Sequence, residues 1–555
     1  MNNKFVFGVD FGTESARAVL VNTTNGEIIA SSVSAYPHGV ITSFLPGTNE
    51  RLQKEWALQH PGDYLYCLKE TIHQCLIESK VSREDVIGIG IDFTASTVMP
   101  IKKSGNPLCF YEEYKKNPHS WVKLWKHHAA HKESLHINEI AYKRNENFVK
   151  RYGGEISEEW MFPKILQVLN EAPEIYDATD KFIEAGDWIV FQLTGEEKRS
   201  SCMAGYKGTW CKESGYPNKD YLKILHPHLE NVVEEKLSND IYSIGSRAGH
   251  LTKEYADELN LTENVVVAVG IIDAHAAVLG AGISEPGSMV MAMGTSICHM
   301  CIDPKEVFVP GIGGVVKDGI IPGFYAYEAG QSAGGDTFVW FMRNCIPKEY
   351  QEEADHRGIS IYKLMEEKAA SLKIGESGVV ALDWWNGNRS VLKDSNLTGT
   401  LLGITLQTKP EHIYRALMES LAFGTRKIID AFIENDINIY KLYAGGGLAE
   451  KNKLLMQIFA DITGKEVHVV TAPHASAMGS AILAATAAGT ESGGWDSVES
   501  AIDHMVHYES EVFNPISENS RTYDKLFTNY AALYNYFGKE APVMKSLLEI
   551  QRNSK

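Results

Sequence analysis

The alternation of apolar runs and turn residues at the start of the chain predicts a small antiparallel sheet. Residues 5–21 contain two apolar runs separated by the Gly-Thr-Glu-Ser turn of residues 12–15, and a third run follows the pair Asn25-Gly26. An Asn-Gly pair between apolar runs is typical of a tight hairpin. We therefore expect residues 5–30 to form an antiparallel meander.

Further along the chain, apolar strands alternate with amphipathic helices. The runs 86–91 and 265–269 have the length and composition of buried strands, whereas residues 64–78 and 159–170 have helical spacing. Strands mixed with helices in this way indicate an α/β fold.

The opening pattern occurs a second time. Residues 287–301 repeat an apolar strand, a Gly-Thr-Ser turn and another apolar strand. The repeat predicts two related domains, which we place at residues 1–255 and 256–555. The length agrees with this, because a chain of 555 residues exceeds the roughly 250–300 residues that one hydrophobic core supports.

Composition and charge exclude several classes of partner. The chain has 53 Lys and Arg against 71 Asp and Glu, and the resulting net charge of −18 opposes binding to nucleic acid or to anionic lipid. No stretch reaches the ~18 apolar residues that a membrane span needs. The eight cysteines form no paired framework, so we expect free thiols in a cytoplasmic protein with no nucleic-acid or membrane partner.

The first turn has the features of a phosphate site. Asp10 stands at the end of a strand, and the turn after it presents backbone N–H groups that can cradle phosphates. Asp10 would then hold Mg²⁺ directly or through water. The alternative is an ordinary hairpin with a turn glycine, and the second copy of the pattern at Gly294–Ser296 weakens that alternative.

A third small-residue turn, Gly445–Gly447, follows the apolar run 441–444 and precedes a helix that begins near Glu450. Glycine backbone can approach a ligand closely, and a helix N-terminus favours anions. The turn lacks the G-x-G-x-x-G spacing of nicotinamide-dependent oxidoreductases, and neither the P-loop nor the protein-kinase motif set occurs. The sequence therefore indicates a different phosphate-binding design.

Taken in order, the three turns resemble the phosphate-one, phosphate-two and adenosine motifs of the superfamily that contains actin, the sugar kinases and the chaperone ATPases. Within that superfamily, the strings WMFPKILQVLNEAPEIY (160–176) and DWIVFQLTG (187–195) look like the central signature of the FGGY carbohydrate kinases. Five further strings resemble the ribulokinase branch, namely IGIDFTAST (89–97), LWKHHA (124–129), CMAGYKGTW (202–210), YEAGQSAGGD (327–336) and LDWWNGNRS (382–390).

This resemblance implies a fold, an activity and cofactors. The fold would be α/β, with two ribonuclease-H-like domains around a catalytic cleft that closes on ATP, Mg²⁺ and a sugar. The activity would be the ATP-dependent phosphorylation of a ketopentose, L-ribulose to L-ribulose 5-phosphate, in arabinose catabolism, and the habit of the family suggests a homodimer. Two alternatives stay open: another FGGY activity, on D-ribulose, ribitol, xylulose or glycerol, and a non-enzymatic actin-like or chaperone-like ATPase.

The resemblance also implies roles for individual residues. Sugar contacts are implied for Ala95, Lys207, Asp273 and Glu328, and Asp273 would be the base that orients the sugar hydroxyl and accepts its proton. ATP contacts are implied for Gly12, Thr13, Glu14, Ser15, Arg17, Gly294, Thr295, Gly445, Gly446, Gly447 and Asn452, and a metal contact for Asp10. Judged alone, Lys207 would be a solvated surface group, Asp273 a helix N-cap and Glu328 a helix-start carboxylate.

Two other groups of side chains have metal-like spacing without a complete ligand set. His128 belongs to a His-rich segment with a helical i,i+4 pair, but no matching ligands follow, so we do not expect zinc there. His127 departs from the aspartate that many FGGY kinases have in this segment, which puts a sugar contact at this position in doubt. Cys298 and Cys301 lie in a predicted strand without a second cysteine pair, so we expect buried strand positions.

Overall fold

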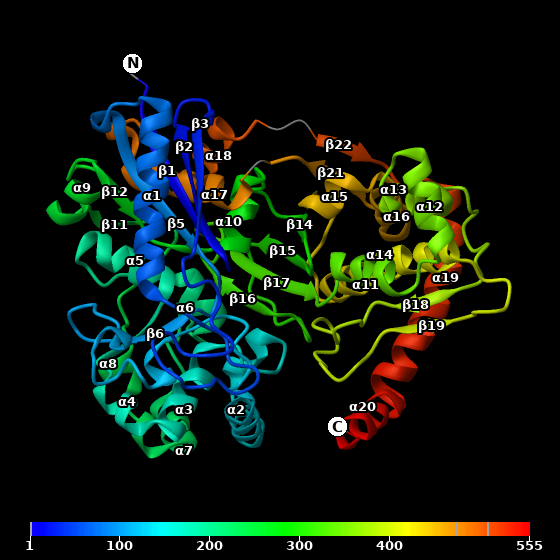
Figure 1. The fold of residues 1–555 in the computed structure, drawn as a ribbon, viewed down its shortest axis with the longest axis horizontal. Coiled ribbons are helices and arrows are strands. Elements are labelled where there is room, and N and C mark those ends of the chain that lie inside the picture. Colours follow the sequence, from blue (N-terminus) through cyan, green and yellow to red (C-terminus); the bar gives the residue numbers. More distant parts are fainter. Residues whose placement is uncertain (1–2, 473, 508–509, 555) are drawn as a thin grey trace.

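The computed structural model describes residues 3–472, 474–507 and 510–554, and it contains two large mixed β-sheets covered by helices (Figure 1). The first sheet has the order β11-β12-β5-β1-β2-β3, and β13 also pairs with β5. Its strands are β1 (Phe5–Phe11), β2 (Ser15–Asn22), β3 (Ile28–Ala35), β5 (Val86–Phe93), β11 (Arg247–His250), β12 (Val266–Ala268) and β13 (Ile271–Ile272). Strands β1, β2 and β3 pair antiparallel, which confirms the predicted meander.

The second sheet repeats the core of the first. Its order is β16-β17-β15-β14-β20-β21-β22. Its strands are β14 (Ser288–Met293), β15 (Ile297–Asp303), β16 (Gly314–Lys317), β17 (Tyr325–Gln331), β20 (Lys441–Gly445), β21 (Glu466–Val470) and β22 (Ser510–Phe513). The antiparallel hairpin β14–β15 with its parallel neighbour β20 corresponds to the hairpin β1–β2 with β5, so the predicted duplication is present.

A smaller lobe is attached to the first sheet and occupies the lower left of Figure 1. It contains a four-stranded sheet of order β4-β7-β6-β8, and the helices around this sheet have a hydrophobic core of their own. Its strands are β4 (Leu58–Gln59), β6 (Val98–Ile101), β7 (Val122–Lys123) and β8 (Lys181–Glu184), with a separate pair β9 (Arg199–Ser200) and β10 (Ile241–Tyr242).

The predicted helices 64–78 and 159–170 correspond to α1 and α3. The helices before the second sheet are α1 (Pro61–Ser79), α2 (His131–Arg144), α3 (Met161–Glu171), α4 (Pro173–Ala178), α5 (Ala185–Thr194), α6 (Ser201–Lys207), α7 (Lys219–Leu225), α8 (Val232–Lys236), α9 (Lys253–Leu259) and α10 (Asp273–Gly280). Helices α6 and α10 begin or end at residues of the candidate site, so these two matter most for function.

The second sheet is covered mainly by the helices on the right of Figure 1. The later helices are α11 (Gly335–Asn344), α12 (Lys348–Arg357), α13 (Ile361–Ala370), α14 (Pro410–Ile433), α15 (Gly447–Lys451), α16 (Lys453–Thr463), α17 (Ala475–Ala488), α18 (Val498–Met505), α19 (Ser517–Asn535) and α20 (Val543–Asn553). A strand pair, β18 (Val380–Leu382) and β19 (Thr400–Leu402), lies beside α14 and α19. Among the described residues, no helix is long and apolar enough to cross a membrane.

Helix α17 leaves the second sheet and packs on the first one. Small residues permit this approach: a Cβ atom on Gly8 would lie 1.8 Å from the carbonyl oxygen of Ala477, and one on Gly90 would lie 1.9 Å from that of Ser480. Helix α10 packs against α17 in the same way, because a Cβ on Gly479 would lie 1.9 Å from the carbonyl oxygen of Ala276. The small residues of the segment 475–488 therefore allow it to pack closely on the first sheet and on α10.

The change from one sheet to the other falls between Ile272 and Ser288. This is later in the chain than the predicted division at residues 255 and 256. Moreover, α17 lies on the first sheet although that division assigns it to the second domain. Each sheet thus has its own hydrophobic core, but α17 is part of the core of the first.

Candidate active site

The first hairpin, residues 5–22, presents a charged pair next to its turn. Asp10 on β1 is level with Arg17 on β2, and Nη1 of Arg17 lies 3.5 Å from Oδ2 of Asp10. The turn between the strands is closed by the backbone N–H of Gly12, which donates to the carbonyl of Ser15 at 3.0 Å. The hairpin therefore offers a carboxylate, a guanidinium and a compact turn within a few residues.

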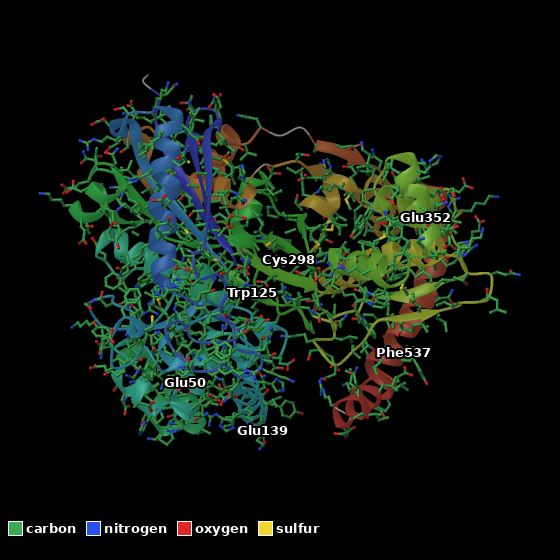
Figure 2. All side chains as sticks on the ribbon, in the orientation of Figure 1. Glu50, Trp125, Glu139, Cys298, Glu352 and Phe537 are labelled. Atoms are coloured by element: carbon green, nitrogen blue, oxygen red, sulfur yellow. The ribbon has the colours of Figure 1, made fainter. Side chains whose placement is uncertain are left out.

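Buried polar side chains hold this turn from behind. The side-chain amide of Gln59 donates to the carbonyl of Thr13 at 2.8 Å, and the hydroxyl of Tyr36 donates to the carbonyl of Gly12 at 3.0 Å. On the other side, the indole N–H of Trp125 donates to Oγ1 of Thr13 at 3.1 Å. Figure 2 shows Trp125 near the middle of the molecule, between the two large sheets. The turn is thus pre-organised by contacts from distant parts of the chain.

Two further carboxylates lie next to Asp10. The parallel register of β1 and β5 places Asp92 level with Asp10. Strand β13 pairs with the same end of β5, and Asp273 follows it as the first residue of α10. Neighbouring strand ends therefore bring together three carboxylates that are far apart in sequence.

The environment raises the pKa of both added carboxylates. Burial, and then the negative charge of Asp10, raise the pKa of Asp273 to about 7, although the backbone N–H of Ala274 donates to its Oδ1 at 2.7 Å and acts in the opposite direction. Burial and Asp10 also raise the pKa of Asp92 well above its usual value. Oδ2 of Asp92 accepts from the Ser480 hydroxyl on α17 at 2.7 Å, and its Oδ1 has no partner among the described residues.

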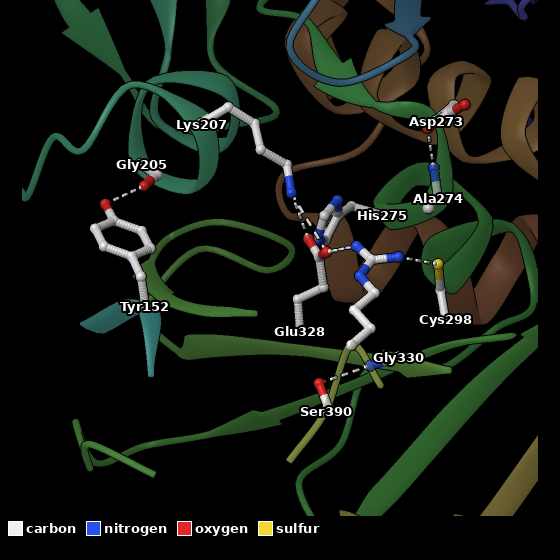
Figure 3. A network of polar contacts seen from close by, with 11 residues as sticks. Tyr152, Gly205, Lys207, Asp273, Ala274, His275, Cys298, Glu328, Gly330 and Ser390 are labelled. Atoms are coloured by element: carbon white, nitrogen blue, oxygen red, sulfur yellow. Dashed lines mark hydrogen bonds and ion pairs between the residues drawn. The ribbon is translucent and has the colours of Figure 1, made fainter. Parts of the chain in front are cut away.

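A second cluster surrounds Glu328 on β17 (Figure 3). Nζ of Lys207, the last residue of α6, lies 3.1 Å from Oε2 of Glu328, and Nη2 of Arg389 lies 2.5 Å from Oε1. Nε2 of His275 on α10 is 3.6 Å from Oε2. Burial alone would raise the pKa of Glu328, but Lys207 and Arg389 outweigh it and lower the pKa to about 2. Glu328 is therefore an anion held by two cations.

The charges of Glu328 and Lys207 both act on the carboxyl group of Asp273, so the structure brings these three residues into one region. Lys207 and Glu328 form an ion pair with each other. Ala95 lies in the loop after β5, which is the strand next to β1. The backbone N–H of the preceding residue, Thr94, donates to the carbonyl of Phe11 at the end of β1, at 3.1 Å. The N-cap alternative for Asp273 is wrong, because the N-cap of α10 is Ile272. The helix-start alternative for Glu328 is also wrong, since this residue lies within a strand.

The loop that carries Ala95 is held by a buried lysine. Nζ of Lys164 on α3 donates to the carbonyl of Ser96 at 2.6 Å and to that of Leu124, next to Trp125, at 2.9 Å. Lys164 belongs to the string 160–176 that carries the family resemblance. One side chain of that string therefore positions two loops at the site.

The second turn, Gly294–Ser296, is docked onto another small-residue turn. The backbone N–H of Gly334 donates to the carbonyl of Thr295 at 2.7 Å, and that of Gly335 donates to the carbonyl of Gly294 at 2.8 Å. Gly334 and Gly335 lie at the start of α11, within the string YEAGQSAGGD. The second turn is thereby held by backbone contacts rather than by charged side chains.

The third turn lies beside the second one. Ala292 on β14 is level with Gly445 on β20, and Gly446 has a φ of +99°. A Cβ atom on Gly446 would lie 2.8 Å from the carbonyl oxygen of Met293, whereas one on Gly447 would have no atom within 4 Å. Asn452 is buried, and its Oδ1 accepts from the backbone N–H of Leu455 at 2.9 Å, so it caps α16.

The histidines and cysteines with metal-like spacing lie in ordinary structural environments. His127 is buried, and its Nε2 lies 3.0 Å from Oε1 of Gln167. Cys298 and Cys301 lie on β15, as predicted, but only Cys301 is buried and Cys298 is half-buried. All eight cysteines are free.

The sequence reasoning missed Asp92, His275 and Arg389. Asp92 had a detectable signal, because Ile91-Asp92-Phe93 repeats the pattern of residues 9–11 at the end of another strand. Arg389 lies inside one of the quoted strings, but no local pattern distinguishes it from a surface arginine. His275 follows Asp273 by two residues on α10, and only the approach of Glu328 shows its relevance.

Family models match both halves of this chain. The model of the N-terminal domain of the FGGY family of carbohydrate kinases matches residues 5–280, and the model of its C-terminal domain matches residues 289–488.

Curated relatives called ribulokinase match almost the whole chain. The one from Geobacillus thermodenitrificans (strain NG80-2) is 54% identical over 548 residues, which cover 99% of this chain and 97% of the relative. The one from Staphylococcus aureus (strain Newman) is 42% identical over 548 residues, which cover 99% of each.

Solved structures share the fold at low sequence identity. The xylulose kinase of Rhodospirillum rubrum has a TM-score of 0.79 and 20% identity, over 96% of this chain and 98% of its own. The Plasmodium falciparum glycerol kinase with ADP has a TM-score of 0.75 and 20% identity, over 96% and 98%. The predicted α/β fold with two ribonuclease-H-like domains is confirmed.

Proposed function

The chain belongs to the FGGY family of carbohydrate kinases, and we propose that it transfers the γ-phosphoryl group of ATP to L-ribulose, giving L-ribulose 5-phosphate in arabinose catabolism. The observation that carries this proposal is the identity of 42–54% to relatives called ribulokinase over 99% of the chain. The site chemistry agrees, because phosphoryl transfer to a hydroxyl requires a nearby base and groups that stabilise phosphate charge.

Asp273 is the proposed base. A carboxylate whose pKa is about 7 is partly ionised at neutral pH and can accept a hydroxyl proton late in the reaction. In a loose transition state the attacking hydroxyl keeps its proton until late, so the main task of Asp273 is to orient the hydroxyl oxygen. Its position at the start of α10, next to Asp10, places this proton acceptor beside the first phosphate turn.

Lys207 and Glu328 are proposed to bind the sugar hydroxyls. The carboxylate of Glu328 accepts hydrogen bonds, and the ammonium group of Lys207 donates them, so the pair can recognise hydroxyls of both hydrogen-bonding senses. Both side chains are buried, with 8% and 5% of their surface exposed, so their hydrogen bonds are strong enough to discriminate between stereoisomers. Ala95 contributes backbone at the adjoining strand end.

The first hairpin is proposed to hold the phosphates and a magnesium ion. The donors around Asp10 fit Mg²⁺, because carboxylate oxygens are its preferred protein ligands and Oδ1 of Asp92 is a buried acceptor that lacks a partner among the described residues. Asp10 would hold the ion directly or through water, and when bound the ion would neutralise phosphate charge. Arg17 adds a positive charge opposite Asp10, where a transferring phosphoryl group would gain from it.

The second and third turns are proposed to hold the rest of the nucleotide. Gly294 and Thr295 present backbone beside Gly445–Gly447, and the open side of Gly447 leaves room for a ligand against the start of α15. We further propose that the reaction takes place in the cytoplasm, where ATP is available, and that the protein is a homodimer.

An ADP-release assay with ATP and magnesium tests the function directly. The acceptor panel contains L-ribulose, D-ribulose, D-xylulose, ribitol, L-arabinose and glycerol. We expect kcat/KM to be highest for L-ribulose. A higher value for xylulose or ribitol would assign the chain to another FGGY activity, and ADP release that does not depend on any acceptor would refute the kinase proposal.

A further inference from the structure

Arg389 contacts the carboxylate of Glu328, at the centre of the proposed sugar site, and the sequence predicts no role for Arg389. Its Nη2 lies 2.5 Å from Oε1 of Glu328, and its Nη1 donates to the Cys298 sulfur at 3.7 Å. Figure 3 shows Cys298 and Lys207 on opposite sides of Glu328. The side chain of Arg389 is 37% exposed while that of Glu328 is 5% exposed, so the guanidinium separates the buried carboxylate from solvent.

The backbone around Arg389 is built to keep the side chain in this position. A Cβ atom on Gly330 would lie 3.1 Å from Cδ and 3.3 Å from Nε of Arg389, so the aliphatic stem lies flat on a strand that has no side chain at this point. The backbone N–H of Gly330 donates to the Ser390 hydroxyl at 3.2 Å. These contacts attach both Arg389 and the next residue to β17, two residues from Glu328.

The same segment also holds the element that supports Lys207. Nζ of Lys393 donates to the carbonyls of Tyr152, at 2.5 Å, and Glu155, at 2.9 Å. The hydroxyl of Tyr152 donates in turn to the carbonyl of Gly205 on α6, at 2.5 Å, two residues before Lys207. Residues 389–393 therefore connect both partners of the Lys207–Glu328 ion pair, which come from the first and the second half of the chain.

The cluster retains capacity for a ligand. His275 is 1% exposed, and neither of its ring nitrogens has a hydrogen-bond partner among the described residues. Its Nε2 is 3.6 Å from Oε2 of Glu328, the oxygen that also faces Lys207. Buried polar groups are normally paired, so a hydroxyl group next to this oxygen would complete the cluster. Oε1 is occupied by Arg389, which leaves the Oε2 edge for that hydroxyl.

We propose that Arg389 is a positioning residue that fixes the orientation of Glu328 and thereby sets the preference of the site for one ketopentose. The inference rests on the proposed function. Held at Oε1, the carboxylate presents only its Oε2 edge to the sugar, beside Lys207 and His275. Lys207 donates to both oxygens, at 3.3 Å to Oε1 and 3.1 Å to Oε2, so without Arg389 a single ammonium group would hold the carboxylate. One ammonium group does not fix the plane of a carboxylate, so the alignment of Glu328 with one particular hydroxyl is lost.

The test compares Arg389→Gln and Arg389→Lys with the wild type in steady-state assays on L-ribulose and D-xylulose. For Arg389→Gln we expect KM for L-ribulose to rise about tenfold or more, because a charge-assisted hydrogen bond to the sugar-binding carboxylate is lost. KM for ATP stays near the wild-type value, and the ratio of kcat/KM for L-ribulose to that for D-xylulose falls. Arg389→Lys, which keeps one charged donor, recovers part of the lost affinity.

Arg343→Gln is the matched control, because Arg343 is exposed on α11 in the same half of the molecule. It should leave every parameter unchanged. Equal increases in the KM values for ATP and L-ribulose in Arg389→Gln, together with a lower Tm, would show a general structural role and overturn the proposal.

A double-mutant cycle with Glu328→Gln separates positioning from direct contact with the sugar. If Arg389 acts through Glu328, adding Arg389→Gln to Glu328→Gln changes KM for L-ribulose by no more than about twofold, since the interaction is already lost. If the increase in KM for L-ribulose in the double variant equals the product of the two single-variant increases, Arg389 acts independently of Glu328, and this result would contradict the inference. A wild-type protein that phosphorylates no ketopentose would refute the proposed function, whereas an active wild type with an unaffected Arg389→Gln variant would refute this inference alone.

Discussion

The two hairpins have the same strand arrangement but opposite chemistry at matching positions. In the first hairpin, Asp10 is level with Arg17 on the antiparallel partner and with Asp92 on the parallel neighbour. In the second, Ala292 is level with Cys298 and Gly445. Charged groups therefore collect in one copy, and small or weakly polar residues occupy the same places in the other.

The difference shows how one duplicated element can serve two tasks. Carboxylates beside a buried strand end raise one another's pKa and can hold a cation or accept a proton. Small residues at the equivalent strand end allow the backbone of neighbouring turns to approach closely, as Gly446 does against Met293. We infer that the first copy carries the chemistry of transfer and the second carries nucleotide binding.

Asp273→Asn should have the largest effect, because it removes the proposed base beside the first hairpin. We expect kcat to fall about 10³-fold, within the range found for positioned general bases, while L-ribulose still binds. Stopped-flow or quench assays measure kcat, and isothermal titration measures binding. Turnover close to the wild-type value would reject Asp273 as the base.

Asp10→Asn compared with Cys298→Ser tests the asymmetry of the hairpins directly. The first change removes a charge that the proposed magnesium site needs, and we expect kcat to fall about 10²-fold or more. The second change, Cys298→Ser, alters the residue of the hairpin β14–β15 that corresponds to Arg17 in the first hairpin. We expect kcat of this variant to stay near the wild-type value. A similar loss in both variants would mean that the two hairpins share the chemistry.

The pH profile should reflect the raised pKa of Asp273. Because the base must be ionised and its pKa is about 7, activity is expected to be half-maximal near pH 7, to level off at higher pH and to fall at lower pH. The fall should approach tenfold per pH unit in kcat/KM for L-ribulose, since that parameter reports groups of the free enzyme. A profile that stays flat down to pH 5 would show that Asp273 has an ordinary carboxyl pKa.

Gly446→Ala compared with Gly447→Ala separates folding from nucleotide binding in the third turn. Gly446 has a φ of +99°, so alanine there should cost about 1–3 kcal/mol in strain and lower Tm. A Cβ on Gly447 meets no protein atom within 4 Å, so Tm should not change. We expect Gly447→Ala to raise KM for ATP instead, because that open side is the proposed nucleotide face. An unchanged KM would argue that ATP lies elsewhere.

Asp92→Asn should have the smallest effect. Burial and the nearby charge of Asp10 raise the pKa of Asp92, which disfavours its charged form, so a neutral amide of the same shape is a mild replacement. We expect kcat to stay within about tenfold of the wild type, the size of a lost neutral hydrogen bond. A loss as large as that of Asp10→Asn would instead show that Asp92 works as an anion.

Much of the fold was predictable because its signals are local. The meander of residues 5–30 depends on apolar alternation and turn residues that lie next to one another, and the duplicated pattern at 287–301 revealed the second sheet. The place of helix α17 on the first sheet was not predicted, because that depends on the glycines of β1 and β5, hundreds of residues earlier.

The candidate site was predictable only in part, for the same reason. Asp10 and the three turns stand at strand ends or glycine-rich turns, which sequence spacing identifies, whereas a role for Asp273 was implied by the family resemblance. The ion pair of Lys207 with Glu328 was not predicted, because the two residues come from different halves of the chain and neither has a local pattern that names its partner. Arg389 was missed because only the tertiary structure brings its guanidinium to Glu328.

The sequence by itself therefore determined the class of fold, the order of the three small-residue turns and the family resemblance, since these depend on neighbouring residues and their spacing. The tertiary structure alone decided the charges of the site. The pKa of Asp273 depends on burial and on Asp10, and that of Glu328 on Lys207 and Arg389. Electrostatic energies follow distance and burial, and separation along the chain determines neither of them.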